Sequence, residues 1–243
     1  MTLELETDPK AFPCIPPADL DDAEVIVAHD WRAFQAVRRL SNHWERPGWS
    51  DQQRAYYWML TFSSAVDLLR QAEYCQEQLE HLGMDPVPHD GLHVTVVRVG
   101  PIDQVSTVQV ERLVELAGGL ADTAFSVLAH PLAGSRGAVR FSLTPWRDLI
   151  QLHASLSAIN EEVRVPGGRP TQSFRPHLGV AYNNADREAS PVVDAVSRLR
   201  SLPPISLNVT ALDLVELRRE ERAYVWDVVR SVPLRSEQTH HSA

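Results

Sequence analysis

One order of segments occurs twice in this chain of 243 residues. Each copy consists of a β-prone run, an amphipathic helical pattern, a loop containing proline, and a second β-prone run with one histidine. The β-prone runs and helical patterns are 54–62, 65–82 and 92–100 in the first copy, and 138–144, 145–163 and 174–183 in the second. Because the histidines lie at equivalent points, the repeat predicts two lobes related by a pseudo-twofold axis in an α+β fold.

The first histidine lies in segment 92–100, which reads Leu-His-Val-Thr-Val-Val-Arg-Val-Gly. Its β-branched residues, with a glycine at each edge, predict a β-strand. Because successive side chains on a strand point to opposite faces, His93 and Thr95 share one face. Such a polar pair is common on ordinary strands, so it becomes a candidate site only where a second segment complements it.

The second histidine lies in segment 174–183, which reads Phe-Arg-Pro-His-Leu-Gly-Val-Ala-Tyr-Asn. Strand alternation places Arg175, His177 and Gly179 on the less apolar face and turns Tyr182 toward the core. Two strands that each project one imidazole can oppose these rings across a cleft. Because histidine titrates near neutral pH, such a pair can supply both a general base and a general acid.

The remaining segments complete one domain. Residues 1–22 are rich in proline and acidic residues and predict an extended or disordered lead-in, and 236–243 form a polar tail. Between them, 23–235 is expected to fold as a single bilobal domain. Its further expected elements are helices at 30–41 (capped by Asp30), 104–120 and 190–202, a strand at 124–131, and strands at 205–217 and 223–234 that complete the sheet of the first lobe.

Charge argues against one class of function. The net charge of −9 disfavours a protein that coats long duplex nucleic acid through a broad basic surface. A local excess of three positive charges nevertheless occurs between residues 130 and 180, although most of its arginines are expected on solvated faces. The residues concerned are Arg136, Arg140, Arg147, Arg164, Arg169 and Arg175, against Asp148, Glu161 and Glu162.

Location is predicted from the absence of targeting signals. No apolar run reaches the roughly 18 residues of a membrane-spanning helix, and the first residues lack the basic and apolar regions of a signal peptide. Cys14 and Cys75 have neither metal-ligand spacing nor the density of a disulfide scaffold. We therefore expect a cytoplasmic protein without membrane contact.

Two other kinds of site are disfavoured. Among the ten histidines, His89 and His93 are four residues apart, but Gly91 and the nearby prolines prevent the helix that would direct both toward one metal. Ser135 lies in a Gly-Ser-Arg-Gly turn without the strand-to-helix context of a nucleophile elbow. Neither a metal nor another cofactor is expected.

The two histidine segments resemble the two-histidine (2H) phosphoesterase superfamily, specifically its 2′-5′ RNA ligase-like branch, over 30–234. The likeness rests on His-Val-Thr-Val at 93–96 and Pro-His-Leu-Gly-Val-Ala-Tyr at 176–182, with Asn-His-Trp-Glu-Arg-Pro-Gly-Trp at 42–49 as flanking support. The family pattern is His-x-Thr/Ser twice, on facing strands of a bilobal fold with antiparallel sheets, outer helices and a central cleft. The first copy is intact, whereas Gly179 stands where the family has Thr or Ser.

The resemblance implies a metal-independent phosphodiesterase that acts on 2′,3′-cyclic phosphates or 2′-5′ linkages of nucleotides or RNA ends, and that runs backward as an RNA ligase. It implies His93 and His177 as the acid–base pair, with the choice of base left open, and Thr95 as a phosphate contact. Strand alternation adds Arg175 as a compensating phosphate contact. We expect a monomer with a nucleotide or RNA-end substrate. The alternative is a nucleotide- or RNA-end-binding module with weakened chemistry, because Gly179 departs from the pattern.

Overall fold

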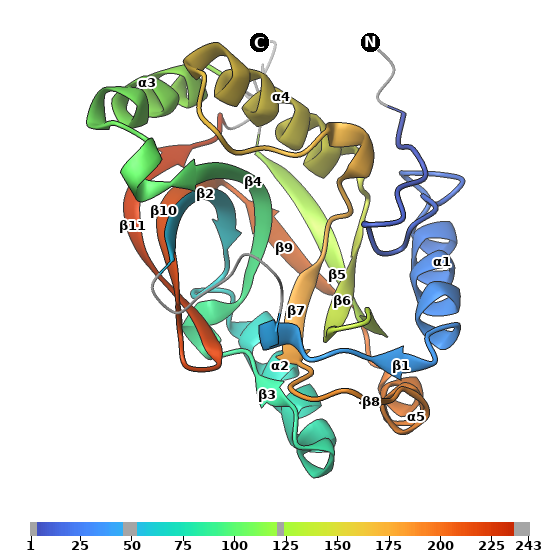
Figure 1. Cartoon of the computed structure of the whole chain (residues 1–243). Coiled ribbons are helices and arrows are strands. Elements are labelled where there is room, and N and C mark those ends of the chain that lie inside the picture. Colours follow the sequence, from blue (N-terminus) through green and yellow to red (C-terminus); the bar gives the residue numbers. More distant parts are fainter. Residues whose placement is uncertain (1–3, 46–52, 121–123, 236–243) are drawn as a thin grey trace.

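The computed structural model describes residues 4–45, 53–120 and 124–235 (Figure 1). Its helices are α1 (Ala23–Gln35), α2 (Val66–Leu79), α3 (Thr107–Gly118), α4 (Arg147–Val163) and α5 (Ser190–Leu199). Its strands are β1 (Arg39–Leu40), β2 (Arg54–Thr61), β3 (Asp85–Pro86), β4 (His93–Pro101), β5 (Phe125–Gly134), β6 (Ala138–Thr144), β7 (Leu178–Tyr182), β8 (Arg187–Glu188), β9 (Ile205–Val209), β10 (Ala211–Glu220) and β11 (Ala223–Pro233). Residues 46–49 of the flanking segment and the predicted tail 236–243 lie outside the described residues.

Two larger antiparallel sheets form in the described residues, in the strand orders β11-β10-β2-β4 and β3-β7-β6-β5-β9. In each repeat the two strands flanking the helix pair directly, β2 with β4 and β6 with β7. Figure 1 shows the two sheets as curled layers facing each other, with β4 close to β7. The predicted repeat and the bilobal α+β architecture are confirmed.

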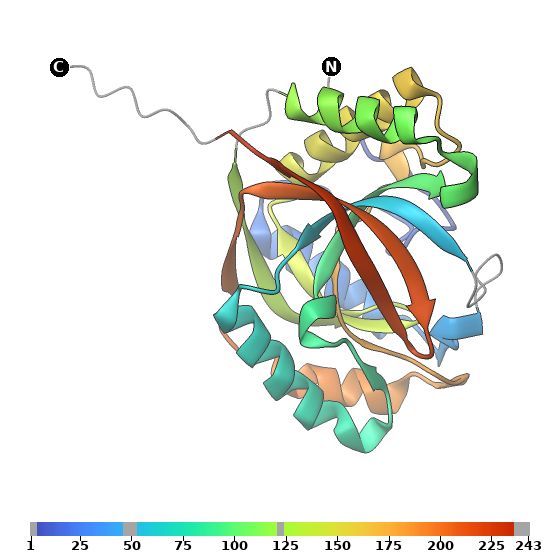
Figure 2. The ribbon, with the colours of Figure 1, turned by 90° about the vertical axis from the view of Figure 1, so that its left-hand side faces the viewer.

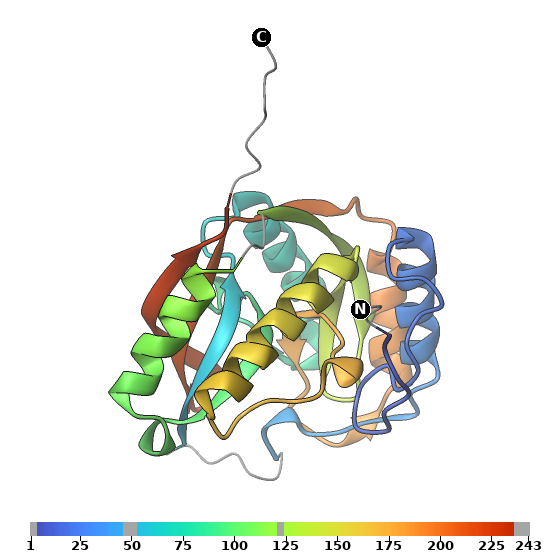
Figure 3. The ribbon, with the colours of Figure 1, turned by 90° about the horizontal axis from the view of Figure 1, so that it is seen from above.

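Helices cover the ends and outside of the two sheets. Figure 3 shows α3 and α4 side by side over one end, and Figure 2 shows α2 and α5 at the opposite end. Each helix turns its buried residues inward, as Leu113 and Ala117 do in α3. In the described part of the chain, the helices are too short or too polar to cross a membrane.

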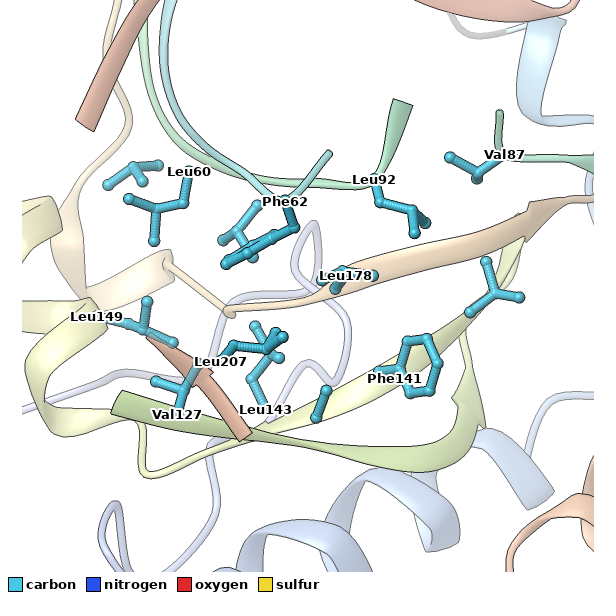
Figure 4. Close-up of a cluster of buried hydrophobic side chains, with 14 of the residues drawn as sticks. Leu60, Phe62, Val87, Leu92, Val127, Phe141, Leu143, Leu149, Leu178 and Leu207 are labelled. Carbon is cyan, nitrogen blue, oxygen red and sulfur yellow. The ribbon is translucent and has the colours of Figure 1, made fainter. Parts of the chain in front are cut away.

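A continuous apolar core joins the two sheets. Leu60, Phe62 and Leu92 of the first lobe meet Phe141 and Leu178 of the second, and all are at most 5% exposed (Figure 4). Burying a side chain of this size contributes roughly 1.5–3 kcal/mol to stability. Because the lobes share one core, their facing strands are held at a fixed separation.

The first helix lies earlier than predicted. It is α1, and its cap is Asp22, whose carboxylate accepts hydrogen bonds from the main-chain nitrogens of Glu24 and Val25 at 2.8 and 3.2 Å. The expected helix over 30–41 was therefore wrong. Asp30 is a buried residue inside the helix, 4.0 Å from a guanidinium nitrogen of Arg140. A tertiary ion pair thus explains this aspartate, which the sequence pattern presented as a cap.

The segment 205–217 is divided between the two sheets. Its first part, β9, pairs with β5 of the second sheet, and the chain crosses at Thr210 to β10 in the first sheet. The prediction that the late strands complete the first lobe's sheet therefore holds for β10 and β11 only. The residue pattern stays β-prone through the crossing, so periodicity does not reveal the break.

The second histidine precedes its strand rather than lying within it. The strand β7 begins at Leu178, whereas the prediction began it at residue 174. Pro176 has no main-chain N–H and cannot donate to a sheet ladder, which explains the late start. Strand alternation therefore does not apply to Arg175 and His177.

A β-bulge alters alternation within β7 itself. The register between β6 and β7 shifts by one residue at Val180. A bulge of this kind turns residues on either side of it toward the same face of the sheet. Gly179 and Tyr182 consequently face the same way. Tyr182 is buried in the apolar core, as the sequence predicted, and it also lines the space between the two sheets.

Candidate active site

A cleft with a volume of about 170 Å³ lies between the two sheets. Both lobes contribute to it: β2, β4, β10 and β11 from the first, and β6, β7 and the turn between β5 and β6 from the second. Its lining residues are His43, Tyr57, His93, Thr95, Ser135, Ala138, His177, Gly179, Tyr182, Leu217 and Tyr224. Among the described residues no aspartate or glutamate lines this cleft, so no carboxylate there repels an anion.

The two predicted histidines lie in this one cleft and are held in the same way. Nδ1 of His93 donates a hydrogen bond to the carbonyl oxygen of Gly91 at 2.8 Å. Nδ1 of His177 donates to the carbonyl oxygen of Arg175 at 2.9 Å. Because a carbonyl oxygen only accepts, each Nδ1 carries a hydrogen, and proton exchange falls to Nε2.

The environments of the two rings differ. His93 is half-buried, and the indole of Trp226 lies edge-on to it with ring centroids 5.1 Å apart. Burial lowers the pKa of His93, an effect that the hydrogen bond to Gly91 partly offsets. His177 is exposed, so water can solvate its charged form. The site therefore favours a neutral imidazole at His93, whereas His177 is open to water.

Thr95 and Gly179 occupy matching positions, each two residues after its histidine. Thr95 faces the cleft from β4 beside His93, as strand alternation predicted. A Cβ atom at Gly179 would lie 3.6 Å from the hydroxyl oxygen of Tyr182, an ordinary contact distance. The phenol therefore lies next to the place where the second motif lacks a side chain.

Sequence reasoning missed an aromatic group at one end of the cleft. His43 is 6% exposed, its Nε2 is 2.9 Å from the hydroxyl oxygen of Tyr224, and its ring stacks on Tyr182 with centroids 4.2 Å apart. Trp44, next in the chain, packs against the same tyrosines. The flanking segment Asn-His-Trp was the one signal that pointed here, whereas nothing in the sequence marked Tyr224.

Arg175 lies outside the cleft. It is 5% exposed, and its guanidinium donates hydrogen bonds to main-chain carbonyl oxygens, mostly of the N-terminal segment. The acceptors are Pro13 at 3.0 Å, Glu6 at 2.6 Å, Cys14 at 3.3 Å, Gln172 at 3.0 Å and Phe174 at 3.0 Å. Because these oxygens occupy the guanidinium, the predicted phosphate contact does not form, and Arg175 instead fixes the N-terminal segment to the domain.

The described residues form no cluster of metal ligands. Among residues 4–45, 53–120 and 124–235, no group of three or more His, Cys, Asp and Glu side chains is placed to hold a metal ion. His89 is exposed in the turn before β4 and does not line the cleft.

Comparison with known proteins gives one family. The family model of the 2′-5′ RNA ligase superfamily matches residues 62–221, which include both histidine segments. A search of curated protein sequences finds no match.

Solved structures show the same fold. The apo form of E. coli LigT matches with a TM-score of 0.57 and 19% identity, covering 76% of this chain and 99% of that one. Its complex with 3′-AMP matches with a TM-score of 0.56 and 19% identity, covering 75% and 99%. TT0787 of Thermus thermophilus matches with a TM-score of 0.56 and 19% identity, covering 76% and 100%. E. coli LigT has also been crystallised with phosphate, ATP and NADP+.

Proposed function

Since the chain belongs to the 2′-5′ RNA ligase superfamily, we propose that it is a phosphodiesterase that opens 2′,3′-cyclic phosphates or cleaves 2′-5′ linkages at nucleotide or RNA ends. The supporting observation is the shared geometry of His93 and His177, whose Nδ1 atoms donate to main-chain carbonyls while both rings line one cleft. The nucleotides and phosphate bound by E. coli LigT, which has the same fold, are consistent with this substrate class.

The two histidines divide the proton transfers. In the opening of a cyclic phosphate, Nε2 of His93 accepts a proton from water as the water oxygen attacks phosphorus. Nε2 of His177 donates a proton to the ribose oxygen as its bond to phosphorus breaks, which leaves a phosphomonoester. Burial keeps His93 neutral and suits it to the role of base. Each positioned group contributes roughly 10²–10⁴-fold to the rate.

Hydroxyl groups hold the phosphate between the rings. The hydroxyl of Thr95 donates to one non-bridging oxygen from the first lobe, and the hydroxyl of Tyr182 donates from the second. Donors fixed before the reaction stabilise the charge that develops on these oxygens. Tyr182 thus supplies the contact that Gly179 cannot.

The same site can join RNA ends. If a 5′-hydroxyl takes the place of water, His93 removes its proton and His177 protonates the leaving oxygen of the cyclic phosphate. The product is a 2′-5′ or 3′-5′ linkage, according to which ribose oxygen leaves. We propose that the protein acts as a monomer.

Turnover in the presence of EDTA tests this function. Purified protein is incubated with 2′,3′-cyclic mononucleotides and 2′-5′ dinucleotides, alongside His93→Ala, His177→Ala and the matched control His89→Ala. We expect turnover by the wild type and by the control, with kcat reduced at least ~10²-fold in either cleft variant. Turnover that is unchanged in His93→Ala, or absent with every substrate, overturns the proposal.

Gly179 favours one alternative, a binding module with weakened chemistry. Under that alternative the wild type binds cyclic nucleotides with no turnover, and Gly179→Thr creates no activity. Turnover by the wild type excludes it.

A further inference from the structure

A second groove, with a volume of about 570 Å³, lies between the N-terminal segment and α1. We call it the arginine groove, because its polar lining consists largely of Arg32, Arg38, Arg39 and Arg136, together with His29. Ala33, Val37 and Phe12 form apolar parts of its wall. Among the described residues no aspartate or glutamate lines it, which is unusual in a protein with a net charge of −9.

Ion pairing within the protein does not account for these arginines. Arg39 pairs with Glu188, and Nε of Arg32 donates to the carbonyl oxygen of Ala28 at 3.2 Å. Within the described part of the chain, Arg32, Arg38 and Arg136 have no carboxylate partner within 4.0 Å, and all three are exposed. Three guanidinium groups that repel one another on one groove favour an external anion.

The arginine groove adjoins the catalytic cleft. Arg136 follows Ser135, which lines the cleft, in the turn between β5 and β6. The carbonyl oxygen of Arg136 accepts a hydrogen bond from the main-chain nitrogen of Ser41 at 2.7 Å, two residues before the cleft residue His43. Figure 1 shows β1 running from α1 past this turn. A chain-like ligand that leaves the cleft over this turn therefore reaches Arg136 first.

The walls of the groove are fixed in place before any ligand binds. The ring of Phe34 on α1 packs so closely on Gly134 that a Cβ atom there would lie 2.5 Å from it. On the other wall, Arg175 holds the carbonyl oxygens of Pro13 and Cys14, and Arg140 donates to that of Phe12 at 3.2 Å. A preformed groove binds without the cost of ordering its walls.

We propose that the arginine groove binds the sugar-phosphate backbone of a single-stranded RNA whose terminal phosphate lies in the cleft. This inference rests on the proposed function and adds that the substrate is an oligonucleotide. Guanidinium groups bind phosphate through paired hydrogen bonds, and the apolar wall accommodates ribose. Apart from Arg136, the arginines lie outside the residues 62–221 that match the family model.

Salt-dependent binding tests the groove separately from catalysis. A fluorescein-labelled eight-nucleotide RNA is titrated by anisotropy in a His93→Ala/His177→Ala background, with and without R32A/R38A/R136A. We expect the triple substitution to weaken binding about 30-fold, and to reduce the slope of log K against log salt by ~2, since each contact to a single strand contributes ~0.7. The matched control is Arg230→Ala, an exposed arginine on β11. The charge-conserving R32K/R38K/R136K retains the slope.

Kinetics separate the failure of this inference from the failure of the proposed function. For an RNA with a 2′,3′-cyclic phosphate end, R32A/R38A/R136A is expected to raise KM about 10-fold, with cyclic mononucleotide turnover unchanged. If the KM for the RNA and the turnover of the cyclic mononucleotide are the same in the wild type and the triple variant, the inference about the groove is overturned and the proposed function is not. Salt-sensitive RNA binding without any turnover overturns the enzyme and keeps the groove as an RNA-binding surface. Displacement of the RNA by polyglutamate at equal charge concentration also overturns the inference, because it shows binding of any polyanion.

Discussion

The hydroxyl oxygen of Tyr182 lies 3.6 Å from the point that a Cβ atom on Gly179 would occupy. The two residues share a face because the register between β6 and β7 shifts at Val180. The second lobe therefore places a phenol hydroxyl next to Gly179, the residue that corresponds to Thr95 in the repeat.

Tyr182→Phe is expected to lower kcat/KM for a 2′,3′-cyclic nucleotide by ~10–100-fold. The substitution removes one hydrogen bond to a charged phosphate, worth roughly 1.5–3 kcal/mol. Tyr74→Phe, on an exposed tyrosine of α2, is the matched control. Steady-state kinetics of the two variants measure the effect, and equal activities would contradict the role of Tyr182.

Gly179→Thr in the Tyr182→Phe background is expected to restore part of the lost activity. The nearest atoms to a Cβ at this position lie 3.6–3.7 Å away, which is ordinary van der Waals contact for that atom. Its hydroxyl then replaces the phenol as donor. Kinetics of the double variant measure the rescue, and a further loss of activity with an unchanged Tm would exclude this arrangement.

The pH dependence of kcat/KM is expected to show an acidic limb with a midpoint below 6.5. Activity requires neutral His93, and burial lowers the pKa of this residue below its usual value. Activity therefore rises as pH increases through that lowered pKa, and falls again where His177 loses its proton. Trp226→Ala exposes the imidazole of His93 and is expected to move the midpoint of the acidic limb to higher pH. A midpoint above 6.5, or no response to Trp226→Ala, would show that His93 is not the base.

The protein is expected to lose stability in mild acid because His153 is buried. It is buried against Phe174, and burial lowers its pKa to about 4. Because the unfolded chain binds a proton near pH 6.5 and the folded chain does not, stability falls as pH decreases from 6.5 toward 4. Between pH 7.5 and 5.0 the contribution is ~2 kcal/mol. Urea unfolding of wild type and His153→Gln measures it; an equal fall in both proteins would assign the loss to other groups.

Arg175→Ala is expected to destabilise the protein by ~3 kcal/mol, because carbonyl oxygens of the N-terminal segment lose their donor. Limited proteolysis should then cut within residues 4–22 before the rest of the domain. The KM for a cyclic mononucleotide should stay within about 3-fold of wild type. A large rise in KM with intact stability would instead make Arg175 a phosphate contact.

The sequence predicted those site residues that depend on simple strand alternation. His93 and Thr95 lie on a regular strand, so their shared face follows from the period of two. The same rule failed for Arg175, which precedes the strand because of Pro176. For Tyr182 it predicted the burial but not the contact with the cleft, because the bulge at Val180 turns this residue to the same face as Gly179. Alternation assumes an unbroken ladder; Pro176 marks the first interruption in the sequence, whereas the bulge at Val180 has no distinctive residue pattern.

Tertiary partners explain the misplaced elements. Asp22 and Asp30 both precede helical patterns, and only the buried contact between Asp30 and Arg140 shows which of them is the cap. Likewise, the division of 205–217 between two sheets depends on β5 and β2 as competing partners for one β-prone run. Local patterns identify such segments as helix or strand but do not identify what they pack against.

The most direct test measures the two imidazoles themselves. Long-range ¹H–¹⁵N NMR at pH 8 reports which nitrogen of His93 and His177 carries the hydrogen, and a titration with inorganic phosphate reports which nitrogens approach the anion. We expect both rings to carry hydrogen on Nδ1, and phosphate to shift the Nε2 signals of both rings with one common Kd. Phosphate that shifts only one ring, or a hydrogen found on Nε2 with Nδ1 bare in either residue, would contradict a shared phosphate site.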